Sequence, residues 1–149
     1  MISNSTDVER ALDAVGQILQ AEGAKFAIIV IGGAALQLLG VVDRATRDVD
    51  VVALGEPPDA NRPRLRDPGE ELPDPLRRAR EIVAEDLGLD SNWLNLGPAL
   101  QWKQGLPPGF EDRLQWRRYH SLTVGIADRR DLIAFKLYAA ADSTGPYTG

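Results

Sequence analysis

The stretch FAIIVIGGAALQLLGVVDRATRDVDVVAL, residues 26–54, decides which fold the chain is expected to adopt. Its opening run FAIIVI is short, continuous and rich in β-branched side chains, which is typical of a buried strand. Gly32-Gly33 ends that run, and the following AALQLL predicts a short helix. DVDVVAL then predicts a second strand, which carries acidic side chains at Asp48 and Asp50. The stretch therefore predicts a strand, a helix and a second strand in direct succession.

The residues before this stretch predict an N-terminal helix. Apolar side chains recur there at helical spacing, at Val8, Leu12, Val15 and Leu19. A capping-box pattern, Thr6-x-x-Glu9, precedes them, and Gly23 is expected to end the helix.

The residues after the stretch predict a helix, two paired strands and a last helix. PLRRAREIVAEDLG is expected to form a helix with Pro75 at its start. Gln115–Tyr119 and Leu122–Ile126 are expected to pair, and Asp128 to cap the helix RRDLIAFKLYAAA. The order α-β-α-β-loop-α-β-β-α predicts an α+β fold, in which helices flank a small twisted mixed β-sheet.

A proline-rich segment separates the two halves of the chain. Six of the ten prolines lie between Pro57 and Pro75, so we expect a loop over residues 55–75. Two interpretations of this loop stay open, an unstructured insertion and a lid or partner contact.

Composition bounds both the domain count and the chemistry. A chain of 149 residues with 44% hydrophobic residues predicts one domain, residues 1–149. The absence of Cys excludes disulfides, thiolate zinc sites and Cys nucleophiles, and a single His excludes a multi-His metal site. A net charge of −5 argues against a general nucleic-acid coat. We expect a cytoplasmic protein without a membrane segment, because no apolar run approaches the length of a span and no signal peptide is visible.

The strongest candidate site is the pair Asp48 and Asp50. Residues i and i+2 of a strand point to the same face, so the two carboxylates repel each other unless a cation or water separates them. Oxygen ligands of this kind suit Mg²⁺, and Mn²⁺ as a substitute. The alternative is an edge strand with a solvated acidic face.

Four further features accompany the acidic pair. Gly32 and Gly33 would let the backbone, and the N–H groups of the following helix, approach a phosphate closely. Arg44 can offset the charge of the paired acids, and Thr46 can donate a hydrogen bond to a phosphate. Lys136 lies on an otherwise apolar helical face, where it either reaches water or meets an anion. The alternatives are a tight turn, a solvated turn and a solvated lysine.

Together these motifs resemble the nucleotidyltransferase superfamily, which has the polymerase-β-like fold. The resemblance covers about residues 26–52 and 93–141, and it is most specific in IGGAALQLLGVVDRATRDVDVV. The most similar branch is the minimal bacterial and archaeal one, which includes nucleotidyltransferase toxins of toxin–antitoxin and abortive-infection systems.

The resemblance implies a role for each motif. Gly32 and Gly33 would hold a nucleoside triphosphate such as ATP, Asp48 and Asp50 would hold Mg²⁺, and Lys136 would contact phosphates. The implied reaction transfers a nucleoside monophosphate to a hydroxyl and releases pyrophosphate.

Two features depart from the family pattern. A third carboxylate is expected as a metal ligand or general base, but Trp93-Leu94-Asn95 is followed by Leu96, and we interpret Asp128 and Asp131 as helix caps. The tail ADSTGPYTG stands where relatives continue into another helix, so we expect a shortened C-terminus.

Acceptor and partner stay open at this point. An RNA end, a protein and a small molecule are all acceptors in this superfamily. A set of arginines is interpreted either as an RNA surface or as solvated faces: Arg113, Arg117, Arg118, Arg129 and Arg130. The tryptophans Trp93, Trp102 and Trp116 either stack a base or pack in the core. No partner for His120 is visible in the sequence.

Two alternative functions also stay open. The first is a catalytically weakened nucleotidyltransferase-fold module that acts through a protein partner or as a homodimer. The second is a glycosyltransferase whose paired acids hold Mn²⁺ and a nucleotide-sugar, although such catalytic domains are much longer than this chain.

Overall fold

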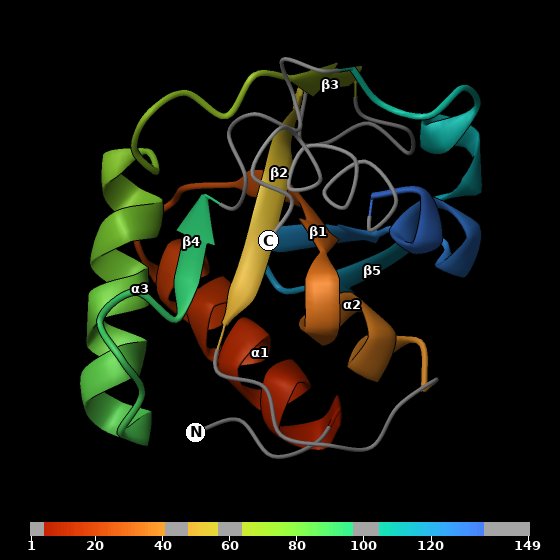
Figure 1. Cartoon of the computed structure of the whole chain (residues 1–149). Coiled ribbons are helices and arrows are strands. Elements are labelled where there is room, and N and C mark those ends of the chain that lie inside the picture. Colours follow the sequence, from red (N-terminus) through yellow and green to blue (C-terminus); the bar gives the residue numbers. More distant parts are fainter. Residues whose placement is uncertain (1–4, 41–47, 57–63, 97–104, 136–149) are drawn as a thin grey trace, which may run out of the picture.

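The computed structural model describes residues 5–40, 48–56, 64–96 and 105–135. The elements, shown in Figure 1, are in chain order α1 (Ser5–Ala21), β1 (Phe26–Ile31), α2 (Gly32–Leu38), β2 (Val49–Glu56), β3 (Arg64–Arg66), α3 (Asp74–Leu87), β4 (Leu94–Leu96), the 3₁₀ helix η1 (Phe110–Arg113), β5 (Gln115–Tyr119) and β6 (Leu122–Ile126). Residues 129–135 are also helical. The sequence prediction of β5 and β6 is confirmed at both ends of each strand.

The strands form one mixed sheet in the order β3-β2-β1-β6-β5, and β4 also pairs with β2. β1 runs antiparallel to β2 and parallel to β6, while β4 runs parallel to β2. The sheet has six strands within the described residues. The predicted α+β fold with a small mixed sheet is therefore confirmed.

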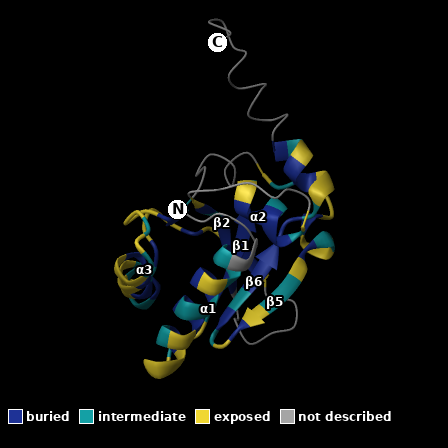
Figure 2. Cartoon of the chain, turned by 90° about the horizontal axis from the view of Figure 1, so that it is seen from below, coloured by how far each residue is buried: buried dark blue, intermediate teal, exposed yellow. Residues whose placement is uncertain are grey.

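The core lies around β1, the central strand. Residues 27–31 are at most 5% exposed, which explains why this strand is apolar without alternation: neighbours cover both of its faces. α1 lies against β5 and β6 and also contacts α3. Its predicted apolar positions Val8, Leu12, Val15 and Leu19 are completely buried. In Figure 2 the outer surface of α3 is exposed, whereas β1 and β6 are buried.

Local signals place most helix ends correctly. α3 has Pro75 in its first turn and is followed by Gly88 in the left-handed conformation (φ +67°). The last helix begins as predicted after Asp128, whose Oδ2 accepts a hydrogen bond from the Arg130 amide (2.9 Å). The predicted capping box places the first helical residue at Asp7, whereas α1 begins two residues earlier, at Ser5, so Thr6 lies inside the helix.

The proline-rich segment is only partly a loop, which corrects the prediction for residues 55–75. β2 continues to Glu56, and β3 pairs with its end, with Leu65 opposite Gly55. Leu65 is 8% exposed and lies between two exposed arginines. This short edge strand therefore buries one apolar side chain. Residues 57–63 lie outside the described residues.

Besides β3, two short elements were not predicted, β4 and η1. Each has only three or four residues, too few for a periodic pattern to be detected. In the described part of the chain no helix is long and apolar enough to cross a membrane.

Candidate nucleotide and metal site

The paired acids lie where β1, α2 and β2 meet. Asp50 pairs with Ile31, the last residue of β1, and Gly32 follows at once as the first residue of α2. Asp48 is exposed and Asp50 is half-buried. The glycine between β1 and α2 and the acidic residues of the β2 region, which are separated in the sequence, therefore lie next to each other in the fold.

Gly32 lies close to the carboxylate of Asp50. A Cβ built on Gly32 would lie 2.7 Å from Asp50 Oδ2, and the φ angle of Gly32 is +78°. The backbone conformation disfavours a side chain here, and the Asp50 carboxylate would have to move to make room for one. Gly33, by contrast, is exposed and leaves the start of α2 uncovered.

β4 adds an amide to the two carboxylates. Asn95 is the register partner of Asp50 in the parallel pairing of β4 with β2. Its side chain lowers the pKa of Asp50, and its own Nδ2 donates to the Asn92 carbonyl (3.4 Å). The sequence did not indicate this contact, because it depends on which strand β4 joins.

The environment of Asp50 disfavours its charge. Burial is the main cause that raises the pKa of Asp50 above 3.8, the repulsion from Asp48 raises it further, and the hydrogen bond from Asn95 lowers it. A cation between the two carboxylates would reverse the sign of the local field. The pair therefore gains more from a bound metal ion than two solvated acids would.

A β-bulge in β2 accompanies this arrangement. Ile29 pairs with Ala53 and Val30 pairs with Val51, so Val52 is the extra residue. Val51 and Val52 are each 1% exposed, although they are consecutive. The bulge lets the remainder of β2 stay in the core while Asp50 keeps its place at the junction.

The donor set fits Mg²⁺. Two carboxylates and the Asn95 side-chain oxygen are the hard oxygen ligands that this ion takes, with its other positions left to water or phosphate. The described residues contain no group of three or more His, Cys, Asp or Glu side chains that could hold a metal ion. Asn95, which is the register partner of Asp50 on β4, contributes an amide and not a further carboxylate.

Asp131 is not a helix cap, which corrects the sequence interpretation. It is 1% exposed, and its carboxylate accepts hydrogen bonds from Nε (2.9 Å) and Nη2 of Arg113. A buried carboxylate bound to a guanidinium in this bidentate manner holds the last helix against η1. Asp131 is therefore not available as the third carboxylate.

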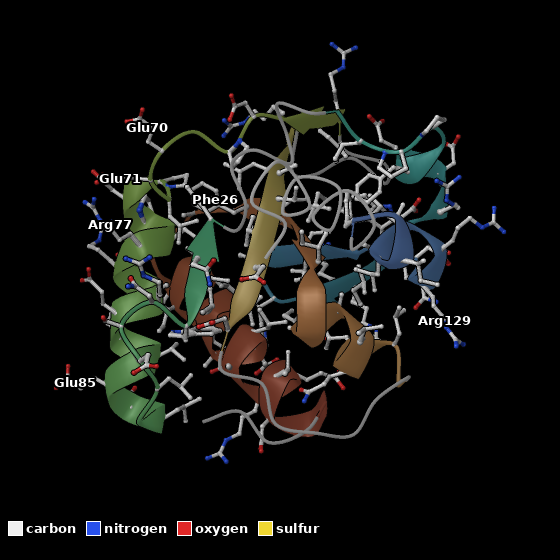
Figure 3. The ribbon with its side chains drawn as sticks, in the orientation of Figure 1. Phe26, Glu70, Glu71, Arg77, Glu85 and Arg129 are labelled. Atoms are coloured by element: carbon white, nitrogen blue, oxygen red, sulfur yellow. The ribbon has the colours of Figure 1, made fainter. Side chains whose placement is uncertain are left out.

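The arginine set divides into structural and exposed members. Arg113 pairs with Asp131, and Arg117 Nη2 donates to the Leu38 carbonyl at the end of α2 (2.8 Å). The other three are exposed, namely Arg118, Arg129 and Arg130, of which Figure 3 labels Arg129. The predicted basic surface is therefore smaller than the sequence indicates.

Trp93 belongs to the core and does not stack a base. It is completely buried, and its Nε1 donates to the Arg80 carbonyl (3.0 Å). Trp116 is half-buried and packs against Gly125. Trp102 lies outside the described residues.

His120 has an acidic partner that the sequence did not reveal. Its Nε2 lies 3.1 Å from Asp13 Oδ1 of α1. The predicted site residues Arg44, Thr46 and Lys136 lie outside the described residues, so their roles stay predictions.

A family model described as "Nucleotidyltransferase of unknown function (DUF6036)" matches residues 9–144. This range includes both parts of the chain that resemble the superfamily. No curated protein and no solved structure gives a significant match.

Proposed function

Because the chain belongs to the family of nucleotidyltransferases of unknown function DUF6036, we propose that it transfers a nucleoside monophosphate from a nucleoside triphosphate to a hydroxyl. The observation that carries the proposal is the junction of Gly32, Asp48 and Asp50. Gly32, which has no side chain, lies close to the carboxylate of Asp50, and Asp48 is near enough to repel that carboxylate. In the proposed reaction the acceptor hydroxyl gives its proton to solvent, its oxygen bonds to the α-phosphorus, the bond from that phosphorus to the bridging oxygen breaks, and pyrophosphate leaves.

Each residue of the junction has a part in the proposal. Asp48 and Asp50 hold Mg²⁺, which when bound neutralises phosphate charge and favours in-line displacement. Gly32 and Gly33 let the triphosphate approach the backbone, and Asn95 orients Asp50. An amide does not accept a proton at neutral pH, so Asn95 is not the base for the acceptor hydroxyl.

The parts of the proposal that concern Arg44, Thr46 and Lys136 rest on the sequence. Arg44 and Thr46 would contact the triphosphate beside the paired acids, and Lys136 would contact its phosphates. We extend the proposal to an RNA end as acceptor in a toxin–antitoxin setting, and the exposed Arg118, Arg129 and Arg130 support it.

One observation favours a second candidate, a nucleotide-binding protein without turnover. Asn95 stands beside Asp50 where a third carboxylate would serve as metal ligand or base. A site with two carboxylates can bind a metal–nucleotide complex and still lack the group that activates the acceptor.

Thermal unfolding with each of the four common nucleoside triphosphates, with and without Mg²⁺, tests the proposal. A ligand that binds only the folded state stabilises it by about 2.7 kcal/mol at a hundred times its Kd. We expect a Mg²⁺-dependent rise in Tm for at least one nucleotide, and its loss in Asp48→Asn.

The matched control is Asp86→Asn, the same substitution on an exposed position of α3. It should leave the nucleotide effect unchanged. An equal rise in Tm in wild type and Asp48→Asn would refute the site. Incubation with labelled nucleotide and an RNA acceptor then separates the two candidates, since only the transferase labels the acceptor.

A further inference from the structure

A pocket lies at the opposite end of β1 from the paired aspartates. Its volume is about 450 Å³, and it is lined by Gln20, Gly23, Lys25, Arg118, His120 and Ser121. Lys25 directly precedes Phe26, the first residue of β1, which Figure 3 labels, whereas Gly32 follows the last residue. The six residues of β1 span roughly 17–20 Å. A nucleotide in this pocket is therefore too far from Asp48 and Asp50 to react there.

A close contact between α1 and the β5–β6 hairpin builds this pocket. A Cβ on Gly16 would overlap the carbonyl oxygen of Tyr119, and the Ser121 amide donates to the Gly16 carbonyl (3.4 Å). The end of α1 is thereby brought beside the hairpin turn, His120-Ser121. The pocket combines residues from two parts of the chain that are far apart in the sequence.

The polar groups on the hairpin side are held in place. Arg118 Nε donates to the His120 carbonyl (3.0 Å), while His120 Nε2 lies 3.1 Å from Asp13 Oδ1. Within the described residues the two terminal nitrogens of Arg118 have no hydrogen-bond partner. A guanidinium that is positioned through Nε and has these donors available suits a phosphate.

The lining is positive although the whole chain is acidic. It includes Lys25 and Arg118 and, in the described part of the chain, no carboxylate. Among the described residues, two acids near the lining each contact a base: Asp13 contacts His120, and Glu22 Oε1 lies 3.4 Å from Arg78 Nη2.

The C-terminal end of α1 does not cancel this charge. A helix end of this polarity repels anions through its unpaired carbonyl groups. Here the carbonyls of Ile18, Leu19 and Gln20 accept hydrogen bonds from the amides of Glu22, Gly23 and Ala24. The end of α1 therefore presents fewer unpaired carbonyl groups to the pocket.

The conformation of His120 is unusual for a residue with a side chain. It has φ +56°, the only positive φ of a non-glycine residue in the described chain. It lies in the two-residue turn between β5 and β6, where glycine is the favoured residue and a side chain costs on the order of 1 kcal/mol. The chain places an imidazole at the pocket at the expense of local backbone stability.

We propose that this pocket is a second, non-catalytic site that binds a nucleotide through its phosphate group. Lys25 and Arg118 supply charge, the Ser121 hydroxyl and the Gln20 amide supply neutral donors, and His120 supplies a ring edge. The volume is large enough for a nucleotide, since small-molecule sites in proteins measure about 300–1,000 Å³. The nucleotide is either free or one unit of an RNA chain, because both present the same phosphate chemistry.

The test is a titration of the full chain in EDTA with AMP and, separately, with a short single-stranded RNA. Amide chemical shifts locate the binding, and we expect changes at Gly23, Lys25 and Ser121. Arg118→Gln should weaken the binding of AMP and of RNA to the pocket about tenfold or more, because a charge-assisted hydrogen bond is lost. The titration is repeated in Asp48→Asn, which should not alter it.

The matched control is Arg10→Gln, the same charge change at an exposed position that does not line the pocket. His120→Gly is a second variant. Glycine is favoured at this position of the turn, so the variant should fold. It should nevertheless bind AMP and RNA more weakly than wild type does. Preference for AMP would identify a free nucleotide, and preference for RNA would identify the RNA backbone. Equal losses in Arg118→Gln and Arg10→Gln, or no shift at any of Gly23, Lys25 and Ser121, would overturn the proposal.

Discussion

At the scale of single residues, Asp50 opposes the stability of the fold in which it lies. Its pKa in the folded chain is raised above 3.8, so the folded state binds this proton more tightly than the unfolded state does. The stabilisation from protonated Asp50 is complete below about pH 3.8 and is lost as the pH rises through the folded pKa. At neutral pH the fold therefore carries the full cost of the buried charge.

Asp50→Asn removes that cost. In EDTA at pH 7 we expect this variant to be at least as stable as wild type, and the difference should shrink as the pH falls through the pKa of Asp50 and towards 3.8. Urea unfolding from pH 4 to pH 8 measures it. A variant that is less stable than wild type at pH 7, by the same amount at every pH, would show that Asp50 stabilises the fold.

Asn95→Asp tests the geometry of the junction by adding the third carboxylate opposite Asp50. Three neighbouring carboxylates repel one another, so we expect lower stability in EDTA and tighter Mg²⁺ or Mn²⁺ binding than in wild type. Calorimetric titration with either metal measures the affinity. Asn92→Asp, just before β4, is the control and should change metal affinity much less.

At the scale of elements, the contact between α1 and the β5–β6 hairpin depends on Gly16. Alanine is better than glycine inside a helix by about 1 kcal/mol, which would stabilise α1. The added Cβ would overlap the Tyr119 carbonyl, and overpacking of this kind costs about 1–3 kcal/mol or more. The second effect is larger, because the atom that must move belongs to the backbone.

Gly16→Ala is therefore expected to lower the free energy of unfolding, despite its better helix propensity. Chemical denaturation checks this against Gln17→Ala, an exposed neighbour in α1 whose change should stay within about 0.5 kcal/mol. A Gly16→Ala variant more stable than wild type would mean that α1 does not approach the hairpin as closely as described.

At the scale of the whole molecule, stability is centred on β1. This strand pairs with β2 on one side and β6 on the other, and residues 27–31 are at most 5% exposed. β3 is an edge strand of three residues with two exposed side chains. The sheet therefore has a protected centre and a weak edge.

Hydrogen exchange should follow this gradient. We expect amides of β1 and β6 to exchange only through global unfolding, and those of β3 to exchange orders of magnitude faster through local opening. Exchange followed by NMR or mass spectrometry at neutral pH measures both. Equal protection of β3 and β1 would contradict the gradient.

The sequence by itself determined the features that depend on near neighbours. The apolar run of β1, the bounds of β5 and β6, and Pro75 at the start of α3 all follow from patterns within a few residues. The proximity of the acids Asp48 and Asp50 also follows from the sequence, although β2 begins at Val49, one residue after Asp48. These patterns sufficed for the α+β fold and for the resemblance that the family match supports.

Only the tertiary structure decided which distant residues meet. Asn95 beside Asp50, Asp131 with Arg113, and His120 with Asp13 each join separate elements. A periodic pattern cannot predict β3 or β4 either, because a segment of three residues forms a strand only where it pairs with β2. Local patterns report on i, i+2 and i+4 neighbours, whereas the order of strands depends on how the whole core packs, and this order places an amide opposite Asp50.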